Sequence, residues 1–386
     1  MRIEQVELYD LVLPLAEPFI ISGGAVLERR SLLVRLLAES GAEGWGECPP
    51  FDLPFYSEET LAGARHLIEE VLIPRVEGRT VEFPGEVDDL LRAGVRGNPF
   101  ARSAIETAAW DLFAAEEHGS LVTLLARALD VTPLAAVPCG VALGIPPDHS
   151  LDALRLRALD AVDAGYRRVK IKVMPGWDVE PVRAVREVLA GTGIPLTVDA
   201  NGAYEWPDSR EQLRQLDDFG LLYIEQPLPP DELLGHAELA REFATPICLD
   251  ETLRDARAAR QVVELGGPRI WNIKVHRVGG LSEACRIWRI ARASGVTLWA
   301  GTMPESGIGS QAPLAMAAMP GFDLPSDLEP SARWFGRNHD VIKLAMRHDG
   351  TMPVPRTSIA RLLDRRRLGA SARRVRPPLA VPQSRG

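Results

Sequence analysis

The chain has 386 residues, of which 46% are hydrophobic and 25% charged, and its net charge is −9. The length fits one large domain with a smaller one, and the composition is that of an ordinary globular protein. A negative charge argues against nucleic acid as a partner, and no apolar run approaches the roughly 18 residues that span a bilayer. Four scattered cysteines and the absence of a signal-peptide core favour the cytoplasm and reduced thiols.

The first 125 residues predict a small α+β domain. Alternating apolar residues indicate three strands, and an apolar stripe of helical period follows in three segments. The expected strands cover residues 1–15, 31–37 and a stretch ending at Cys48, and the expected helices cover 57–77, 85–94 and 101–116. A meander followed by helices is typical of a two-layer unit.

A unit of about 25 residues then repeats between residues 126 and 330, and each unit is an apolar run followed by a helical pattern. Such a series predicts a closed barrel of parallel strands surrounded by helices. The strands should end near Val141, Lys172, Asn201, Glu225, Asp250, Lys274 and Ala300, with an eighth near Phe322-Asp323. The helices should cover residues 151–164, 179–190, 211–217, 232–242, 255–265 and 281–293.

The pattern fades in the C-terminal segment, residues 331–386. One more strand is expected over 341–346 and a short helix over 357–367. From about residue 368 the chain is rich in arginine and proline, and we expect a disordered tail there.

Three acidic residues, Asp199, Glu225 and Asp250, end neighbouring strands of the predicted barrel. The strand ends of such a barrel converge on one mouth, where active sites lie. Three converging carboxylates repel one another unless a cation lies between them, and oxygen ligands suit Mg²⁺ or Mn²⁺. Asn201 points the same way as Asp199, whereas Glu251 is expected to support the site without binding the ion.

Three lysines are directed at the same mouth. Lys170 and Lys172 alternate on one strand and therefore share a face, and Lys274 ends a strand across the barrel. A metal ion flanked by lysines can stabilise the enolate that forms when a base removes a proton next to a carboxylate. We expect Lys170 to hold the carboxylate and Lys172 or Lys274 to move the proton, with a pKa lowered by the neighbouring cations.

These residues resemble the enolase superfamily in its muconate-lactonizing-enzyme-like branch. The barrel carries VKIKV, VDAN, IEQP, LDE and NIK in order, and the first domain carries GWGEC at 44–48, YSEE at 56–59 and SAIETAAWDL at 103–112. Further runs, KVMPGWDVEPVRAVRE at 172–187, LGHAELA at 234–240, TPICLDE at 245–251 and RVGG at 277–280, are similar to the o-succinylbenzoate synthase / N-succinylamino acid racemase family. Superfamily sites use a lysine or histidine base together with Mg²⁺.

The resemblance implies a modified (β/α)8 barrel, (β/α)7β, capped by an α+β domain that the C-terminus completes. Lid loops are implied near 19–24 and 50–56. Asp199, Glu225 and Asp250 would bind Mg²⁺, Lys172 would be the base, and Lys274 would be the opposite acid or base. Substrate contacts are implied at Lys170, Asn201, Phe19, Tyr56, Gly301, Thr302 and Met303. The implied partner is a small carboxylate, and a homo-oligomer is expected.

The implied reaction is racemisation of N-succinylamino acids or other N-acylamino acids, the dehydration that forms o-succinylbenzoate for menaquinone, or both. Substrate-facing positions depart from the family: Thr302 replaces a glycine, Ala142 a serine and Ser310 an arginine. A dipeptide epimerase or muconate-type cycloisomerase therefore remains an alternative, as does a metal-dependent binding protein without activity. A sugar-acid dehydratase would need a histidine base, but we expect the candidate, His276, to be a loop residue.

Overall fold

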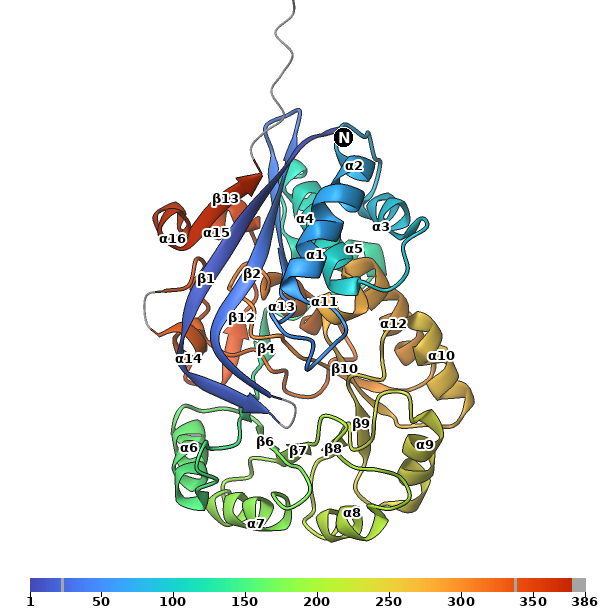
Figure 1. Cartoon of the computed structure of the whole chain (residues 1–386), viewed down its shortest axis with the longest axis vertical. Helices are drawn as coiled ribbons and strands as arrows, with labels where there is room; N and C mark the ends of the chain where they lie inside the picture. The colour runs from blue at the N-terminus through green and yellow to red at the C-terminus, as the bar shows by residue number, and fades with distance from the viewer. Residues whose placement is uncertain (22–23, 337–338, 377–386) are drawn as a thin grey trace, which may run out of the picture.

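The computed structural model describes residues 1–21, 24–336 and 339–376. An antiparallel sheet with helices packed against it forms one part, and a curved parallel sheet ringed by helices forms the other (Figure 1). This arrangement confirms the predicted modified barrel with an α+β cap.

The cap is built on a long hairpin. Its sheet has the strand order β13-β1-β2-β3, with bounds β1 (Ile3–Ile21), β2 (Gly24–Ala38), β3 (Glu43–Cys48) and β13 (Ala372–Arg376). Both strands of the hairpin extend well beyond their predicted ends and reach the barrel, where Ile145 N donates to Ile20 O at 3.2 Å. Of the predicted lid over 19–24, residues 22–23 lie outside the described residues, and the others continue the two strands.

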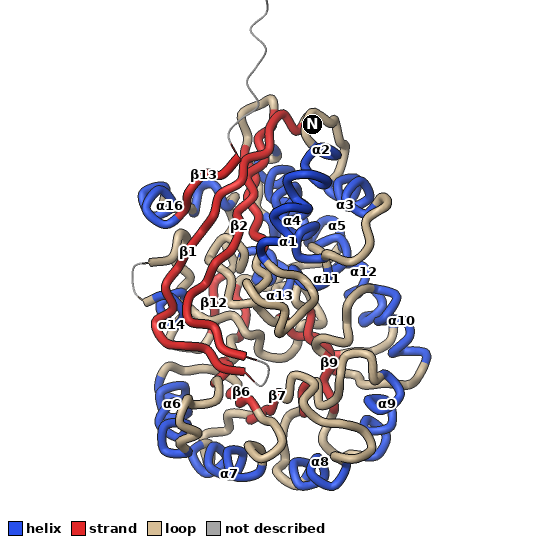
Figure 2. The backbone as a smooth tube through the Cα atoms, viewed as in Figure 1, coloured by secondary structure: helices blue, strands red, loops and turns tan. Residues whose placement is uncertain are grey.

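Five helices and one π-helical turn complete the cap beside this sheet (Figure 2). They are α1 (Leu61–Leu67), the π turn (Ile68–Leu72), α2 (Ile73–Val76), α3 (Pro84–Arg92), α4 (Pro99–Glu116) and α5 (Leu121–Leu129). The buried helix α4 lies directly on β3, because glycines let the two backbones approach: a Cβ at Gly46 would lie 2.1 Å from Ala104 O. Within the described ranges, no helix combines the length and apolarity needed to cross a membrane.

The barrel sheet is parallel and has the order β11-β10-β9-β8-β7-β6-β5. Its strands are short and buried on both faces, as their uninterrupted Val, Ile and Leu content predicts. They are β5 (Val141–Leu143), β6 (Val169–Lys172), β7 (Leu196–Asp199), β8 (Ile224–Glu225), β9 (Ile247–Leu249), β10 (Ile270–Ile273) and β11 (Thr297–Ala300).

An irregular segment, residues 321–327, takes the eighth position, where the sequence predicts a strand near Phe322-Asp323. On one side Leu298 N donates to Gly321 O and Asp327 N to Ala300 O, both at 2.9 Å. On the other side Gly140 N donates to Ser326 O at 2.8 Å. The ring therefore closes through scattered hydrogen bonds and an isolated bridge instead of a regular strand.

The outer helices agree with the predicted ranges to within about two residues. They are α6 (Leu151–Asp163), α7 (Val179–Val188), α8 (Arg210–Asp217), α9 (Leu233–Glu242), α10 (Ala256–Glu264) and α12 (Leu281–Ala293), joined by α11 (Val275–Val278) and α13 (Gln311–Ala317). Asp255 and Ser150 cap α10 and α6 by accepting backbone N–H groups of the first turn.

The C-terminal segment differs from its prediction in two places. Residues 341–346 form no strand; there Leu344 N–H lies beside α14 (Ser331–Phe335), and Leu344 O accepts a hydrogen bond from the backbone N–H of Ser331. The strand of this segment is instead β12 (Thr351–Pro353), which pairs with β4 (Ala136–Pro138). The helical prediction over 357–367 corresponds to α15 (Ile359–Leu362) and the start of α16 (Arg365–Ser371).

The prediction of a disordered tail from about residue 368 is wrong for residues 368–376. There α16 leads into β13, which pairs with β1 of the cap. Acidic side chains of the cap explain the order: Arg374 forms an ion pair with Glu7, and Arg376 with Glu77 at 3.0 Å. Residues 377–386 lie outside the described residues.

Glu47, at the end of β3, joins the cap to the barrel. It is fully buried, and its carboxylate accepts from Ser306 N at 3.1 Å and Gly309 N at 3.0 Å in the loop after β11. A buried carboxylate that binds two backbone N–H groups fixes this loop relative to the cap.

We predict that Glu47→Ala lowers the free energy of unfolding by about 2–4 kcal/mol, because two buried N–H groups lose their acceptor. Guanidinium denaturation followed by circular dichroism measures this change. The control is Glu39→Ala, an exposed site in the same domain, which should stay within about 0.5 kcal/mol of wild type. Equal stability of the two variants would show that Glu47 does not hold the joint.

Candidate active site

Six charged side chains stand at the ends of five adjacent barrel strands. Lys170 and Lys172 lie on β6, Asp199 ends β7, and Glu225 ends β8; Asp250 and Lys274 directly follow β9 and β10. All six are at most 8% exposed. The predicted convergence at one mouth is thus present in the structure.

The order of the strands places the lysines on opposite sides of this mouth. Counting from β5, Lys172 stands in the second of eight ring positions and Lys274 in the sixth, which in a closed barrel face each other. The three acidic residues fill the third, fourth and fifth positions between them.

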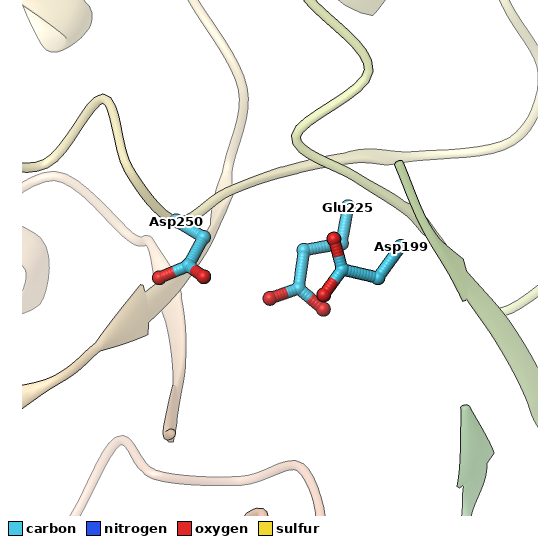
Figure 3. A group of neighbouring side chains, drawn as sticks. All are labelled: Asp199, Glu225 and Asp250. Atoms are coloured by element: carbon cyan, nitrogen blue, oxygen red, sulfur yellow. The ribbon is translucent and has the colours of Figure 1, made fainter. Parts of the chain in front are cut away.

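The carboxylates of Asp199, Glu225 and Asp250 point into one space, and each offers an oxygen within 4.8 Å of the others (Figure 3). Gln226 supports this geometry: its side-chain oxygen accepts from Asp250 N at 3.0 Å and so ties the end of β8 to that of β9. Three buried oxygens at this spacing suit a hard divalent cation such as Mg²⁺, with room for water and substrate oxygens.

Electrostatics at the triad indicate a need for positive charge. Burial and the neighbouring Asp199 carboxylate raise the pKa of Glu225 to about 8. Burial also disfavours the charged forms of Asp199 and Asp250, but nearby cations outweigh it and lower the pKa of both: Lys172 and Lys170 act on Asp199, and Arg277 and Lys274 act on Asp250. The central carboxylate is therefore the one that the protein's own cations neutralise least.

The β6 lysines contact the triad directly. Lys172 Nζ donates to Asp199 Oδ2 at 2.6 Å and to Asn201 Oδ1 at 2.8 Å. Lys170 Nζ lies 2.8 Å from Glu225 Oε2 and 2.7 Å from Asp327 Oδ2. Burial alone would lower the pKa of Lys170, but these carboxylates raise it well above its usual value, so Lys170 is a fixed cation.

Lys274 donates to Tyr56 OH at 2.8 Å and lies 2.9 Å from Asp250 Oδ2. We expect cations to lower the pKa of a catalytic lysine, but here the pKa of Lys274 is raised: burial opposes its charge, and Asp250 and Tyr56 more than compensate. The expected lowering includes the charge of a bound metal ion beside Lys274, so it stays a prediction.

A pocket opens above these groups, between barrel and cap. The residues that line it include Lys170, Lys172, Asn201, Lys274, Phe19, Tyr56, Thr302 and Met303. Of the residues expected to contact substrate, Gly301 is the one outside this wall; it packs closely on Asn272, and a Cβ there would lie 2.9 Å from Lys274 Cε. Ala142 lines the pocket, whereas Ser310 belongs to a small neighbouring cavity.

The second predicted lid contributes to the pocket as well. From the loop near 50–56, Phe51 and Tyr56 line the wall, with their rings 6.0 Å apart in an edge-to-face contact. Phe19 at the end of the cap hairpin packs edge-on against Trp334 at 5.0 Å. Aromatic side chains from two cap segments therefore cover a site whose charges come from the barrel.

Several polar residues of the site are not identified by sequence reasoning. Arg277 pairs with Asp250, Arg168 pairs with Asp327, and both Asp327 and Glu329 line the pocket. Asp327 ends the irregular closing segment and Glu329 follows it; this segment lacks the apolar run that marks the other strands. His276, expected in a loop, is buried in α11, where its Nε2 lies 3.0 Å from Gly309 O and away from the pocket wall.

Comparison with known proteins identifies the family. Residues 4–126 match the family described as mandelate racemase / muconate lactonizing enzyme, N-terminal domain, and residues 153–358 match the enolase C-terminal domain-like family. The chain belongs to the enolase superfamily.

Its relatives point to one branch of this superfamily. An N-succinylamino acid racemase from Thermus thermophilus is 44% identical over 92% of this chain and 93% of its own length. An o-succinylbenzoate synthase from Bacillus subtilis is 38% identical over 90% of each chain. The crystal structure of an enolase-superfamily protein from Enterococcus faecalis V583 has a TM-score of 0.87 at 36% identity and covers 97% of this chain and 99% of that one.

The family predicted from sequence is thereby confirmed: the protein is an enolase-superfamily enzyme of the o-succinylbenzoate synthase / N-succinylamino acid racemase family. Enzymes of this superfamily act on small molecules with a divalent metal ion, and the buried triad could bind one.

We predict that a divalent cation raises the melting temperature of the enzyme, because binding to the folded state alone stabilises it by about 2.7 kcal/mol at a hundredfold excess over Kd. Differential scanning fluorimetry with MgCl₂ and with EDTA measures this shift. Glu225→Gln should remove most of the response, since it deletes the central carboxylate. Glu251→Gln is the matched control and should keep the response. A full response in Glu225→Gln would place the ion elsewhere.

Proposed function

We propose that this enzyme removes the proton next to the carboxylate of an N-acylamino acid and returns it to either face, so that the two enantiomers interconvert. The observation that carries this proposal is the placement of Lys172 and Lys274 in opposite ring positions, with the acidic triad between them. A two-base racemisation needs a proton donor and an acceptor on opposite faces of one carbon atom, within reach of a group that stabilises the enolate.

In the proposed site, Asp199, Glu225 and Asp250 hold Mg²⁺, for which Mn²⁺ could substitute. The bound ion supplies positive charge that stabilises the enolate of the substrate carboxylate. Lys170 donates to that carboxylate, and Lys172 removes the proton from one face. Lys274 delivers or removes it on the other, where Tyr56 OH and Asp250 orient its ammonium group. Asn201 holds Lys172 by accepting its hydrogen bond at 2.8 Å.

Water must be kept from the carbanionic intermediate, and the cap supplies the groups for this. We propose that Phe19 and Tyr56 contact the substrate and, with Phe51, close the pocket. Met303 and Thr302, in the loop after β11, complete the wall. We propose that Gly301 also belongs to the substrate site, because its small size lets this loop approach Lys274.

The names of the relatives support N-acylamino acids as substrates, with N-succinyl compounds as the reference set. The Bacillus subtilis relative supports a second candidate, the dehydration that forms o-succinylbenzoate, in which the same base removes a proton and Lys274 serves as a cation beside the enolate. A dipeptide epimerase or a muconate-type cycloisomerase would use the same groups on other substrates. We also propose a cytoplasmic homo-oligomer; the four buried cysteines, all free thiols, support the cytoplasm.

We predict that Lys172→Ala and Lys274→Ala each lower racemisation by about 10²–10⁴-fold, the usual contribution of a general acid or base. Each variant should still exchange the α-proton of one enantiomer, because the remaining lysine reaches one face, and the enantiomer should differ between the two. Proton NMR in D₂O on separate D and L samples of N-acetyl and N-succinyl amino acids measures this exchange. A variant that exchanges both enantiomers at equal rates would contradict the two-base assignment.

The second candidate reaction has its own test. If the enzyme is a synthase, it will convert the cyclohexadiene precursor to o-succinylbenzoate, and EDTA will stop the reaction. The loss of the precursor's ultraviolet absorbance measures this conversion. Lys172→Ala should abolish this turnover. Turnover of the precursor without exchange of any N-acylamino acid would make dehydration the sole activity. If the enzyme catalysed neither reaction, the remaining alternative would be a metal-dependent binding protein.

A further inference from the structure

A carboxylate lies in the part of the pocket that the proposed reaction does not use. Glu329, shortly after the closing segment, lines the pocket together with Ala142 and Thr302. Its side chain is 2% exposed. A glutamate is seldom buried to this extent unless its oxygens are bound by donors or cations.

One carboxylate oxygen of Glu329 lacks a hydrogen-bond donor among the described residues. Oε1 accepts from Ala142 N at 3.2 Å. Oε2 accepts no hydrogen bond from any residue that the structure describes; it lies 3.3 Å from Arg333 Nε, a close ion pair without an aligned hydrogen bond. Burial raises the pKa of Glu329 to about 7, and Arg333 offsets this only in part. A further donor would therefore be favourable here.

Other charged groups nearby do not supply that donor. Asp327, two residues earlier, already binds Arg168 and Lys170. Arg333 is 28% exposed, stacks on Trp334 and is not among the residues that line the pocket. Glu329 therefore borders both the substrate pocket and the small neighbouring cavity, and its partner cation lies outside the pocket wall.

The ring order shows which end of a substrate this carboxylate faces. The closing segment takes the eighth ring position and β8, with Glu225, the fourth, so that they lie across the barrel from each other. A substrate whose α-carboxylate is held at the triad, with its α-carbon between the two lysines, directs its remaining groups toward the seventh, eighth and first positions. These positions carry Thr302, Glu329 and Ala142.

We infer that Glu329 is a specificity-determining residue that accepts a hydrogen bond from an N–H, O–H or ammonium group at the end of the substrate farthest from the metal. Its charge disfavours a second carboxylate at that end. This inference rests on the proposed function and narrows its acyl group: the enzyme prefers N-acylamino acids whose acyl chain ends in a hydrogen-bond donor over those that end in a carboxylate.

The test compares two ligands of the same shape, an N-succinyl amino acid and its N-succinamoyl analogue, in which a terminal amide replaces the distal carboxylate. Isothermal titration calorimetry at pH 8.5 with Mg²⁺ gives Kd for each, so the result does not depend on turnover. We expect wild type to bind the succinamoyl ligand at least about tenfold more tightly. In Glu329→Gln, which keeps the shape and removes the charge, the two affinities should lie within about threefold.

Glu305→Gln is the matched control. Glu305 is equally buried and lies beside the neighbouring small cavity, but it does not line the substrate pocket, so its ratio should equal that of wild type. Tighter binding of the succinyl ligand by wild type, or the same ratio in wild type and Glu329→Gln, would overturn the inference. Exchange of N-acetyl amino acids, which lack either distal group, tests the proposed function separately: it can succeed while the inference fails, and the binding ratio can hold while exchange fails.

Discussion

Mutual repulsion of three buried carboxylates is the constraint on which the site depends. Two unit charges 4 Å apart interact by about 4 kcal/mol at the effective dielectric constant of a protein surface, so Asp199, Glu225 and Asp250 cannot all stay ionised without compensation. The protein supplies part of it through lysines in contact with the outer two carboxylates, Lys172 with Asp199 and Lys274 with Asp250. The cations that compensate the charge of the triad are thus the same groups that we propose to move protons. A divalent ion held by the three carboxylates would neutralise them and weaken their hold on these ammonium groups, so the proposed metal binding and the proposed activation of the lysines would be coupled.

The barrel and the cap contribute different kinds of residues to the site. Every group proposed to act on the reacting carbon comes from the barrel, whereas the aromatic residues that line the pocket come from the cap. The cap can cover the pocket only if the two parts keep their relative position. Glu47 provides this through backbone N–H groups of the loop after β11, the loop that also carries Thr302 and Met303. One buried side chain of the cap therefore helps to set the shape of the pocket.

Sequence reasoning found the regular parts of this structure and missed the irregular ones. The convergence of the acidic triad and the lysines could be predicted because these residues end apolar runs at a nearly constant spacing, and parallel strands carry that spacing to one mouth. Asp327 and Glu329 could not, since the closing segment holds its place through scattered hydrogen bonds and has no periodic pattern. Arg277 was missed because its role depends on a contact with Asp250 that spacing does not reveal. The order of residues 372–376 was missed for a similar reason: it depends on cap carboxylates that are distant in sequence.

This division has a physical consequence for how the enzyme acquires specificity. The third to fifth ring positions carry the acidic triad, and a change there would unbalance the charges at the centre of the site. Among the described residues of the seventh, eighth and first positions, Asp327 is the one that pairs with a lysine of the site. The eighth position already has an irregular backbone, and there Asp327 pairs with Arg168 and Lys170. A side chain such as Glu329 can therefore change without disturbing the triad or the lysines. Since the reaction requires only that an α-carboxylate reach the metal, the chemistry can be retained while the far end of the pocket selects the substrate.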